Sequence, residues 1–342
     1  MQSGISTHIG METETVVIFV VLAIAAFLID MWAHRGDKPI SLSAAAIWTV
    51  FWIAIGLSFA LFLGYHFNYE VASLYLAGYL FEQALSVDNL FVMMAIFSWF
   101  GVQDKYCHRV LYWGVLGAVV FRLIFVVIGS SLFAMGPIVE LIFAFVVLLS
   151  GIMMLKKKDH EEVSDFSSHI AYKAVKWFFP IFPKMVGHAF FLSRKEVDAQ
   201  MAKPENKGIT LKRTGAWFCT PLFLCLAVIE TTDVLFAFDS VPAVIAVSRE
   251  PLIVYSAMMF AVMGLRSMYF VLDALRKYLV HLEKAVIVLL FFIAFKLAAA
   301  ASEHLFDFGM QIDVYISLGV IAVILGIGVL SSLIFPKKDE HK

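Results

Sequence analysis

The sequence predicts an all-α, polytopic membrane protein, and three observations support this fold class. Hydrophobic residues make up 61% of the 342 residues and charged residues only 15%, whereas a soluble domain is about 45–50% apolar and about 25% charged. The apolar residues form long stretches rather than the short spacings of an element that buries one face. Acidic residues nevertheless occur inside several of these stretches. The chain is therefore expected to cross lipid and to hold a polar site within it.

Nine stretches are long enough to cross a bilayer as helices, which takes about 20 apolar residues. They lie near residues 14–32, 44–65, 71–99, 110–133, 137–155, 217–247, 252–275, 284–301 and 313–335. Glu12 and Glu14 precede the first stretch, and no basic segment does. We therefore expect the first stretch to be a span of the mature protein rather than a cleavable signal peptide.

The charges between the stretches predict a topology, because short cytoplasmic loops are enriched in Lys and Arg. Basic residues lie in every second connection, at positions 35 and 38, 105 and 109, 156–158, 276–277 and 337–338. The connections at 66–70, 134–136 and 302–312 contain none, and the remaining one contains only Arg249. This pattern predicts an N-terminus outside and a cytoplasmic C-terminus.

Two stretches, 71–99 and 217–247, are about 30 residues long, which exceeds the length needed to cross. We expect each of them to be bent or broken. Glu82 to Asn89 and Asp233 to Ser240 share a pattern of an acid, five residues, a second acid and a polar residue. The next stretch in each half carries one arginine, Arg122 or Arg266.

These similarities predict two repeats of three helices each, and an odd number of helices forces opposite orientations in the membrane. Inverted repeats of secondary transporters hold the substrate near the bilayer midplane, between broken helices. The predicted parts are an N-terminal two-helix segment, a first repeat, a cytoplasmic loop, a second repeat, and a C-terminal helix with its tail. They cover residues 1–70, 71–155, 156–216, 217–301 and 302–342.

The polar connection at 156–216 is expected to have some structure of its own. His169 to Phe182 predicts an amphipathic segment at the membrane interface, ended by proline. The stretch from His188 to Lys195 is expected to pair as a strand with Gly208 to Arg213. The alternative is a disordered linker.

Five acids lie inside the predicted spans: Glu82, Asp88, Glu230, Asp233 and Asp239. Each costs about 2.5–3.5 kcal/mol at the centre of a membrane helix, so they indicate function. Because acids six residues apart diverge on a straight helix, we expect Pro242 to unwind the turn beside Asp239. Asn89 and Ser240 add neutral oxygens.

Such oxygens suit hard cations such as Mn²⁺, Mg²⁺ or Ca²⁺, and they do not separate these three metals. The predicted metal ligands are Glu82, Asp88, Asn89, Glu230, Asp233, Asp239 and Ser240. The alternative is that Arg122, Arg266 and Lys296 neutralise the acids in structural ion pairs. Three bases would still leave two of the five acids to protons, cations or water. Asp30, near the end of the first stretch, is a further candidate.

Other function classes find little support. A net charge of −1 argues against general nucleic-acid binding. Cys107, Cys219 and Cys225 lack the spacing of a thiolate metal site. The sequence contains neither H-E-x-x-H nor G-x-S-x-G, so we expect no enzyme activity and no fixed cofactor.

Two segments resemble the signatures of the TerC family of integral membrane proteins. They read EQALSVDNLF from Glu82 and ETTDVLFAFDSVPA from Glu230. The resemblance extends through GVLGA from Gly114 to the arginine of that span, and through FAVMGLRS from Phe260. The branch it most resembles is the Alx-like, pH-responsive one. The chain departs from the family pattern at Ala257 and Met258, where Ser-Asn is common, and before Lys296, where Gly is common.

The resemblance implies export of Mn²⁺ across a bacterial inner membrane, with an older association with tellurite resistance. It implies that the five intramembrane acids, Asn89, Ser240 and Asp30 occupy the family's polar positions. Since carboxylates bind either H⁺ or a divalent cation, we expect proton antiport. The competing hypothesis is a membrane scaffold that binds metal and docks partner proteins through the 156–216 loop. The sequence leaves carrier versus channel and the oligomeric state open.

Overall fold

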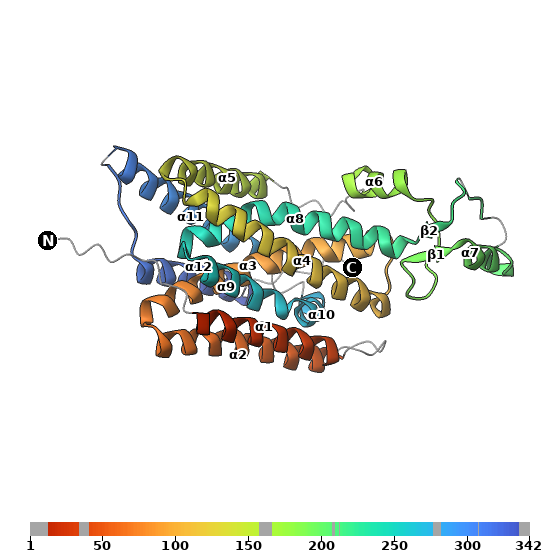
Figure 1. Cartoon of the computed structure of the whole chain (residues 1–342), viewed down its shortest axis with the longest axis horizontal. Coiled ribbons are helices and arrows are strands. Elements are labelled where there is room, and N and C mark those ends of the chain that lie inside the picture. Colours follow the sequence, from red (N-terminus) through yellow and green to blue (C-terminus); the bar gives the residue numbers. More distant parts are fainter. Residues whose placement is uncertain are drawn as a thin grey trace.

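The protein is a helical bundle with a small lobe at one end (Figure 1). The computed structural model describes residues 13–33, 41–156, 166–206, 209–211, 213–275, 282–306 and 308–334. Within these ranges the side chains of residues 13–16, 27, 30–33, 104 and 239 also lie outside the description. The predicted all-α, polytopic architecture is confirmed.

The helices of the bundle follow the predicted stretches closely. They are α1 (Thr13–Ala33), α2 (Leu42–His66), α3 (Tyr69–Phe100), α4 (Asp104–Phe133), α5 (Pro137–Lys156), α8 (Pro221–Ser248), α9 (Pro251–Met263), α10 (Leu265–Leu275), α11 (Leu282–Phe306) and α12 (Val314–Ile334). In the described ranges, seven helices are long and apolar enough to cross a membrane, and α9 with α10 would form an eighth span. Nine spans stays a prediction, in which α1 would supply the ninth.

Local signals in the sequence set several helix ends. Ser41 and Asn68 cap α2 and α3, because their side chains accept hydrogen bonds from backbone N–H groups three residues later. Pro221 and Pro251 open α8 and α9, where a missing N–H has no consequence. Gly101 ends α3 with a φ of +62°, a conformation that glycine adopts without strain.

Neither of the two long stretches is broken, so the unwinding predicted beside Asp239 was wrong. The α3 helix continues for 32 residues, and α8 continues through Pro242. The bend lies instead at Gly264, where α9 and α10 meet at 55°. A Cβ on Gly264 would lie 3.3 Å from Cβ of Trp52, so glycine permits α2 to pack closely at the bend. The extra length of α3 extends toward the lobe (Figure 1).

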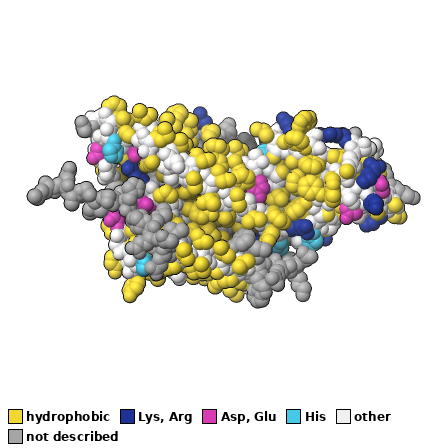
Figure 2. Space-filling model, in the orientation of Figure 1, with side chains coloured by type: hydrophobic (Ala, Val, Ile, Leu, Met, Phe, Trp, Pro, Cys, Tyr) yellow, Lys and Arg dark blue, Asp and Glu magenta, His cyan; other side chains and the backbone are white. Residues whose placement is uncertain are grey.

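Of the three apolar clusters among the described residues of the bundle, one lies among α1, α2, α3 and α9, and the other two lie at different heights along the bundle. The far cluster, away from the lobe, includes Phe81, Leu85, Val126, Val241, Val244, Leu290 and Ile293. The lobe-side cluster includes Leu90, Met94, Leu111, Val115, Val228, Ile229, Leu265 and Ala171. Hydrophobic side chains also cover much of the outer face, whereas Lys and Arg gather mostly toward the lobe (Figure 2). In a membrane protein, the side chains that face lipid and most of those in the interior are both expected to be apolar.

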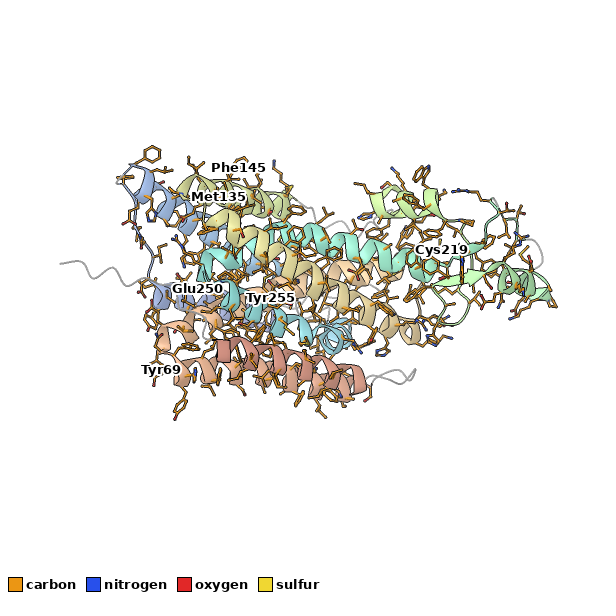
Figure 3. All side chains as sticks on the ribbon, viewed as in Figure 1. Tyr69, Met135, Phe145, Cys219, Glu250 and Tyr255 are labelled. Atoms are coloured by element: carbon orange, nitrogen blue, oxygen red, sulfur yellow. The ribbon has the colours of Figure 1, made fainter. Side chains whose placement is uncertain are left out.

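The lobe comprises residues 166–219 and has regular structure, so its described residues do not fit a disordered linker. Its elements are η1 (Phe166–Ser168), α6 (Ile170–Phe178), β1 (Phe191–Ser193), α7 (Arg194–Met201), η2 (Pro204–Asn206) and β2 (Trp217–Cys219). The helix predicted within His169 to Phe182 is present and ends before Pro180. Cys219 marks the lobe in Figure 3, and Tyr69 and Glu250 lie at the opposite end of the bundle.

The predicted partner of the lobe strand was wrong. The β1 strand pairs antiparallel with β2, Leu192 opposite Phe218, and not with Gly208 to Arg213. Gly208 and Lys212 lie outside the described residues, and 209–211 form no strand. The pairing buries Leu192 and Phe218 against Phe182 and Val197. This apolar core determines the strand partner.

A capping box at the start of α7 makes the stability of the lobe depend on pH. The backbone N–H and the hydroxyl of Ser193 each donate a 2.7 Å hydrogen bond to Glu196 Oε2. These bonds lower the pKa of Glu196 below its usual value of 4.5. Because the pKa is lower in the folded state, the stabilisation is fully present above pH 4.5 and is lost as pH falls through the lowered pKa.

We therefore expect hydrogen exchange at the backbone amides of 194–201 to become faster, after correction for intrinsic rates, as the pH is lowered below 4.5. Glu196→Gln should remove this pH dependence. If both proteins show the same pH dependence, the capping box is not its source.

Candidate functional site

Four charged residues lie near the boundary of the two apolar clusters and form what we call the charged layer: Glu82, Arg122, Glu230 and Asp233. On α4, Arg122 lies between Ala118 of the lobe-side cluster and Val126 of the far cluster. On α8, the two acids lie between Ile229 and Ala237, which belong to the same two clusters. On α3, Glu82 is one turn from Ser86, where the clusters meet. The layer therefore has an apolar cluster on either side of it.

Arg122 joins three helices through its guanidinium group. One nitrogen, Nη1, forms an ion pair with Glu82 of α3, and Nη2 lies 3.7 Å from Oδ1 of Asp233 on α8. The exposed fractions of Glu82, Arg122 and Asp233 are 0%, 1% and 3%. Burial away from water strengthens the attraction and makes an unpaired charge costly.

Glu230 lies one turn before Asp233 on the same face of α8 and is partly buried. Its carboxylate packs directly against Gly117 of α4, in space that a Cβ on this glycine would need. Its Oε2 is buried and accepts no hydrogen bond from the described residues.

The structure places the three predicted bases differently. Arg122 pairs with predicted acids, as the structural alternative required. Arg266 is buried over the ring of Tyr112, with its guanidinium carbon 5.3 Å from the ring centre. The electrostatic neighbours of Lys296 are Arg249 and Asp313, toward the far end of the bundle. Within the charged layer, Arg122 thus contacts two of the three acids, Glu82 and Asp233.

The structure describes the side chains of three other predicted ligands, Asp88, Asn89 and Ser240. Asp88 is six residues from Glu82, which places it about 120° around the unbroken α3 helix, and it is partly buried. The side chains of Asp239 and Asp30 lie outside the described part of the chain. Since α8 does not unwind, the backbone of Asp239 lies about 120° around the helix from Asp233. Asn89 and Ser240 are buried within the bundle.

No group of three His, Cys, Asp or Glu side chains that could hold a metal ion is present among the described residues. The seven-residue ligand set therefore stays a prediction. What the structure brings together is its centre: Glu82 and Asp233, the first acids of the two aligned patterns, meet on Arg122. The inverted repeat also stays a prediction, and the two halves differ at least in that α4 is continuous where α9 and α10 are bent.

Three features of the site region escaped sequence reasoning. Gly117 was read only as part of a motif, although a glycine one helix turn from an intramembrane arginine is a signal of close packing. Ser86 lies four residues after Glu82, on the same face of α3. At the far end, Arg249 Nη2 lies 3.3 Å from Oε2 of Glu140 and joins α8 to α5. Nothing in the local sequence of Glu140 indicated that partner.

Comparison with known proteins extends over nearly the whole chain. Residues 67–340 match the model of a family described as integral membrane protein TerC family. A tellurium resistance protein TerC of Serratia marcescens is 60% identical over 99% of both chains. A putative membrane-bound redox modulator Alx of Photorhabdus laumondii is 32% identical over 90% of this chain and 91% of its own. The thylakoid membrane protein TERC of Arabidopsis thaliana is 34% identical over 84% and 68%.

Relatives of the Alx-like branch are thus among the matches, at lower identity than the Serratia marcescens protein. No solved structure gives a significant match.

The ion pair between Glu82 and Arg122 should show strong energetic coupling. Glu82→Gln and Arg122→Gln should each lower the free energy of unfolding in detergent by about 3–5 kcal/mol, since each leaves a charge buried without its full set of partners. The double variant should lose less than the sum of the two. Glu70→Gln, at an exposed position of the same α3 helix, is the control and should have little effect. Additive losses would show that the two side chains do not interact.

Proposed function

The chain belongs to the TerC family of integral membrane proteins, and from this premise we propose that it exports a divalent cation, Mn²⁺ foremost, by exchange for protons. The observation that carries the proposal is the charged layer, in which Arg122 pairs with Glu82 and lies beside Asp233, while the Glu230 carboxylate packs against Gly117 inside the bundle. If Arg122 balances the charge of Glu82, the carboxylates of Glu230 and Asp233 still require positive charge. In the interior of a membrane protein that charge comes from a proton or a cation.

Arg122 is the internal competitor of the transported cation in this mechanism. It holds Glu82 and lies beside Asp233, so a divalent ion that approaches these carboxylates must draw them away from the guanidinium group. Protonation of the acids has the opposite effect, because it removes the charge that holds the metal. Competition between protons and metal for the same carboxylates gives antiport without another coupling site.

The two apolar clusters favour a carrier over a channel. The lobe-side cluster lies between the charged layer and the lobe, and the far cluster lies between the layer and the opposite end. A hydrated ion cannot pass packed Leu, Val and Phe side chains without rearrangement. One cluster at a time must therefore loosen, which is alternating access in the sense of paired repeats.

The choice of Mn²⁺ rests on the family resemblance, and the oxygen ligands support a hard cation in general. The names of the relatives refer to tellurium resistance and to redox modulation. We place the protein in a bacterial inner membrane with the lobe in the cytoplasm, since Lys and Arg gather toward the lobe. The N-terminus would then lie outside.

The second candidate function is that of a scaffold, and the observation that favours it is an exposed hydrophobic surface on the lobe. Ile170, Trp177 and Phe178 are large hydrophobic side chains of α6 that are more than half exposed. Such a surface fits either the membrane interface or a protein partner. A scaffold would bind metal without moving it, whereas a transporter moves metal in vesicles that contain no other protein.

We expect reconstituted protein to move Mn²⁺ into or out of proteoliposomes along an imposed pH gradient. Glu82→Gln, Asp233→Asn and Asp88→Asn should each reduce the initial flux by at least about tenfold, because each removes a carboxylate charge that the ion requires. Glu70→Gln should transport as the wild type does. Bound metal without flux would favour the scaffold, and full flux in all three variants would exclude the charged layer as the site.

Gly117 offers a finer test, with Gly114 as its matched control on the same helix. A Cβ at Gly117 would displace the Glu230 carboxylate, whereas a Cβ at Gly114 would meet Cγ2 of Ile229 at an ordinary 3.7 Å. Gly117→Ala should therefore lower Mn²⁺ flux severalfold, and Gly114→Ala should leave it near the wild-type value. Equal flux in the two variants would mean that the position of Glu230 is unimportant for transport.

A further inference from the structure

Several serines are buried in the bundle without a hydrogen-bond partner. The hydroxyl oxygens of Ser86, Ser240 and Ser248 accept or donate no hydrogen bond within the described part of the structure. An unsatisfied buried polar group costs about 1–3 kcal/mol, so such groups usually signal an unseen ligand, water or ion. The hydroxyls of Ser130 and Ser267 are also without a partner there, whereas Ser256 donates to the carbonyl oxygen of Ile253 and Ser317 donates to that of Asp313.

On α3 the polar positions form one line that leads from the charged layer toward the lobe. Glu82, Ser86 and Asn89 have the spacing i, i+4 and i+7, which places them on one face of the helix. All three are more than nine-tenths buried. The rise of about 1.5 Å per residue carries Asn89 some 10 Å beyond Glu82, to the level of the lobe-side cluster.

On α8 a corresponding line leads the other way. Asp233 and Ser240 are seven residues apart, and Ser248 is a further eight, so all three lie within about 60–80° of one another around the helix. They too are more than nine-tenths buried. Because α8 begins at the lobe and α3 ends there, increasing residue number leads away from the lobe on α8 and toward it on α3. The two lines together extend from the charged layer toward both ends of the bundle.

We propose that Ser86 with Asn89 and Ser240 with Ser248 form the two arms of a translocation path that carries a partly dehydrated divalent cation to and from the charged layer. Each hydroxyl or amide oxygen would take the place of one water oxygen of the ion. The arms carry no charge, so the ion passes along them without being held as it is by the carboxylates. The inference rests on the proposed transport function, and Ser86 and Ser248 are path residues beyond the predicted ligands.

The path makes a prediction about water access from each side that does not require transport. Ser86→Cys and Ser240→Cys should react with a membrane-impermeant, cationic methanethiosulfonate, the first only from the lobe side and the second only from the opposite side. Each should react at least about tenfold faster than Ser256→Cys, which replaces an equally buried serine with a satisfied hydroxyl. Lys195→Cys, exposed on α7, identifies the lobe side in right-side-out and inverted vesicles.

The native cysteines give a low background in this experiment. Cys107, Cys219 and Cys225 are buried. Burial raises the pKa of Cys219 to about 11, which leaves little reactive thiolate near neutral pH. The wild-type protein therefore serves as the unlabelled reference.

Labelling from opposite sides would support the path. Reaction no faster than Ser256→Cys, or reaction of both cysteines from one side only, would overturn it. Measurements of Mn²⁺ flux distinguish a failure of the proposed path from a failure of the proposed transport function. Ser86→Ala should lower Mn²⁺ flux by about tenfold while Ser256→Ala does not, the loss of one ion contact being of this order.

Wild-type protein that transports Mn²⁺ but shows no sided labelling would refute the path alone. Sided labelling in a protein that moves no Mn²⁺ would refute the transport function and leave a water-accessible path.

Discussion

The absence of water in the bilayer interior is the constraint on which this structure depends. A buried charge must find its partner within the protein, and Arg122 is the partner that α4 offers to both α3 and α8. This contact brings two segments more than a hundred residues apart to one point. Apolar clusters pack on both sides of this point.

The charged layer contains three acidic residues and one arginine. This excess of acidic residues distinguishes the layer from a purely structural ion pair. A structural network tends toward neutrality, because each unpaired charge inside the protein lowers its stability. Here Glu230 adds a third carboxylate against the backbone of α4 at Gly117. With all three acids ionised, the layer would carry more negative than positive charge, and the proposed exchangeable cation would balance it.

Sequence reasoning succeeded where lipid alone decides the structure. Only helices satisfy their own backbone in a membrane, so the apolar stretches predicted helices whose ends lie within a few residues of those observed, and Ser41, Asn68 and Pro251 set several of those ends. Sequence reasoning failed where contacts between distant segments decide the local structure. Pro242 removes one hydrogen bond, but α8 packs against both α3 and α4 and remains one continuous helix. The partner of β1 depended on the small core around Phe182.

For the site, the acids were predictable because any carboxylate in an apolar stretch is conspicuous. Their grouping was not predictable: three bases were available, and helix geometry alone could not select Arg122 for Glu82 and Asp233. Gly117 contributes by having no side chain, which leaves space for the Glu230 carboxylate. The sequence does not show which residue uses that space until the neighbouring helix is known. Ser86 was hidden for a related reason, since serine in a membrane helix ordinarily bonds to its own backbone, as Ser58 does.

The attachment of the lobe to α8 has a mechanical consequence. Thr220, the residue between β2 and α8, donates a 2.7 Å hydrogen bond from its hydroxyl to the carbonyl oxygen of Ala189, and its backbone N–H donates to that of Phe190. Phe182 and Cys219 are joined by a further backbone hydrogen bond. The first turn of α8 and the lobe sheet therefore form one stiff joint. If α8 tilted, the lobe would move with it as one body. A fluorophore or spin label on α7 would therefore report movements of the α8 segment that carries Glu230 and Asp233.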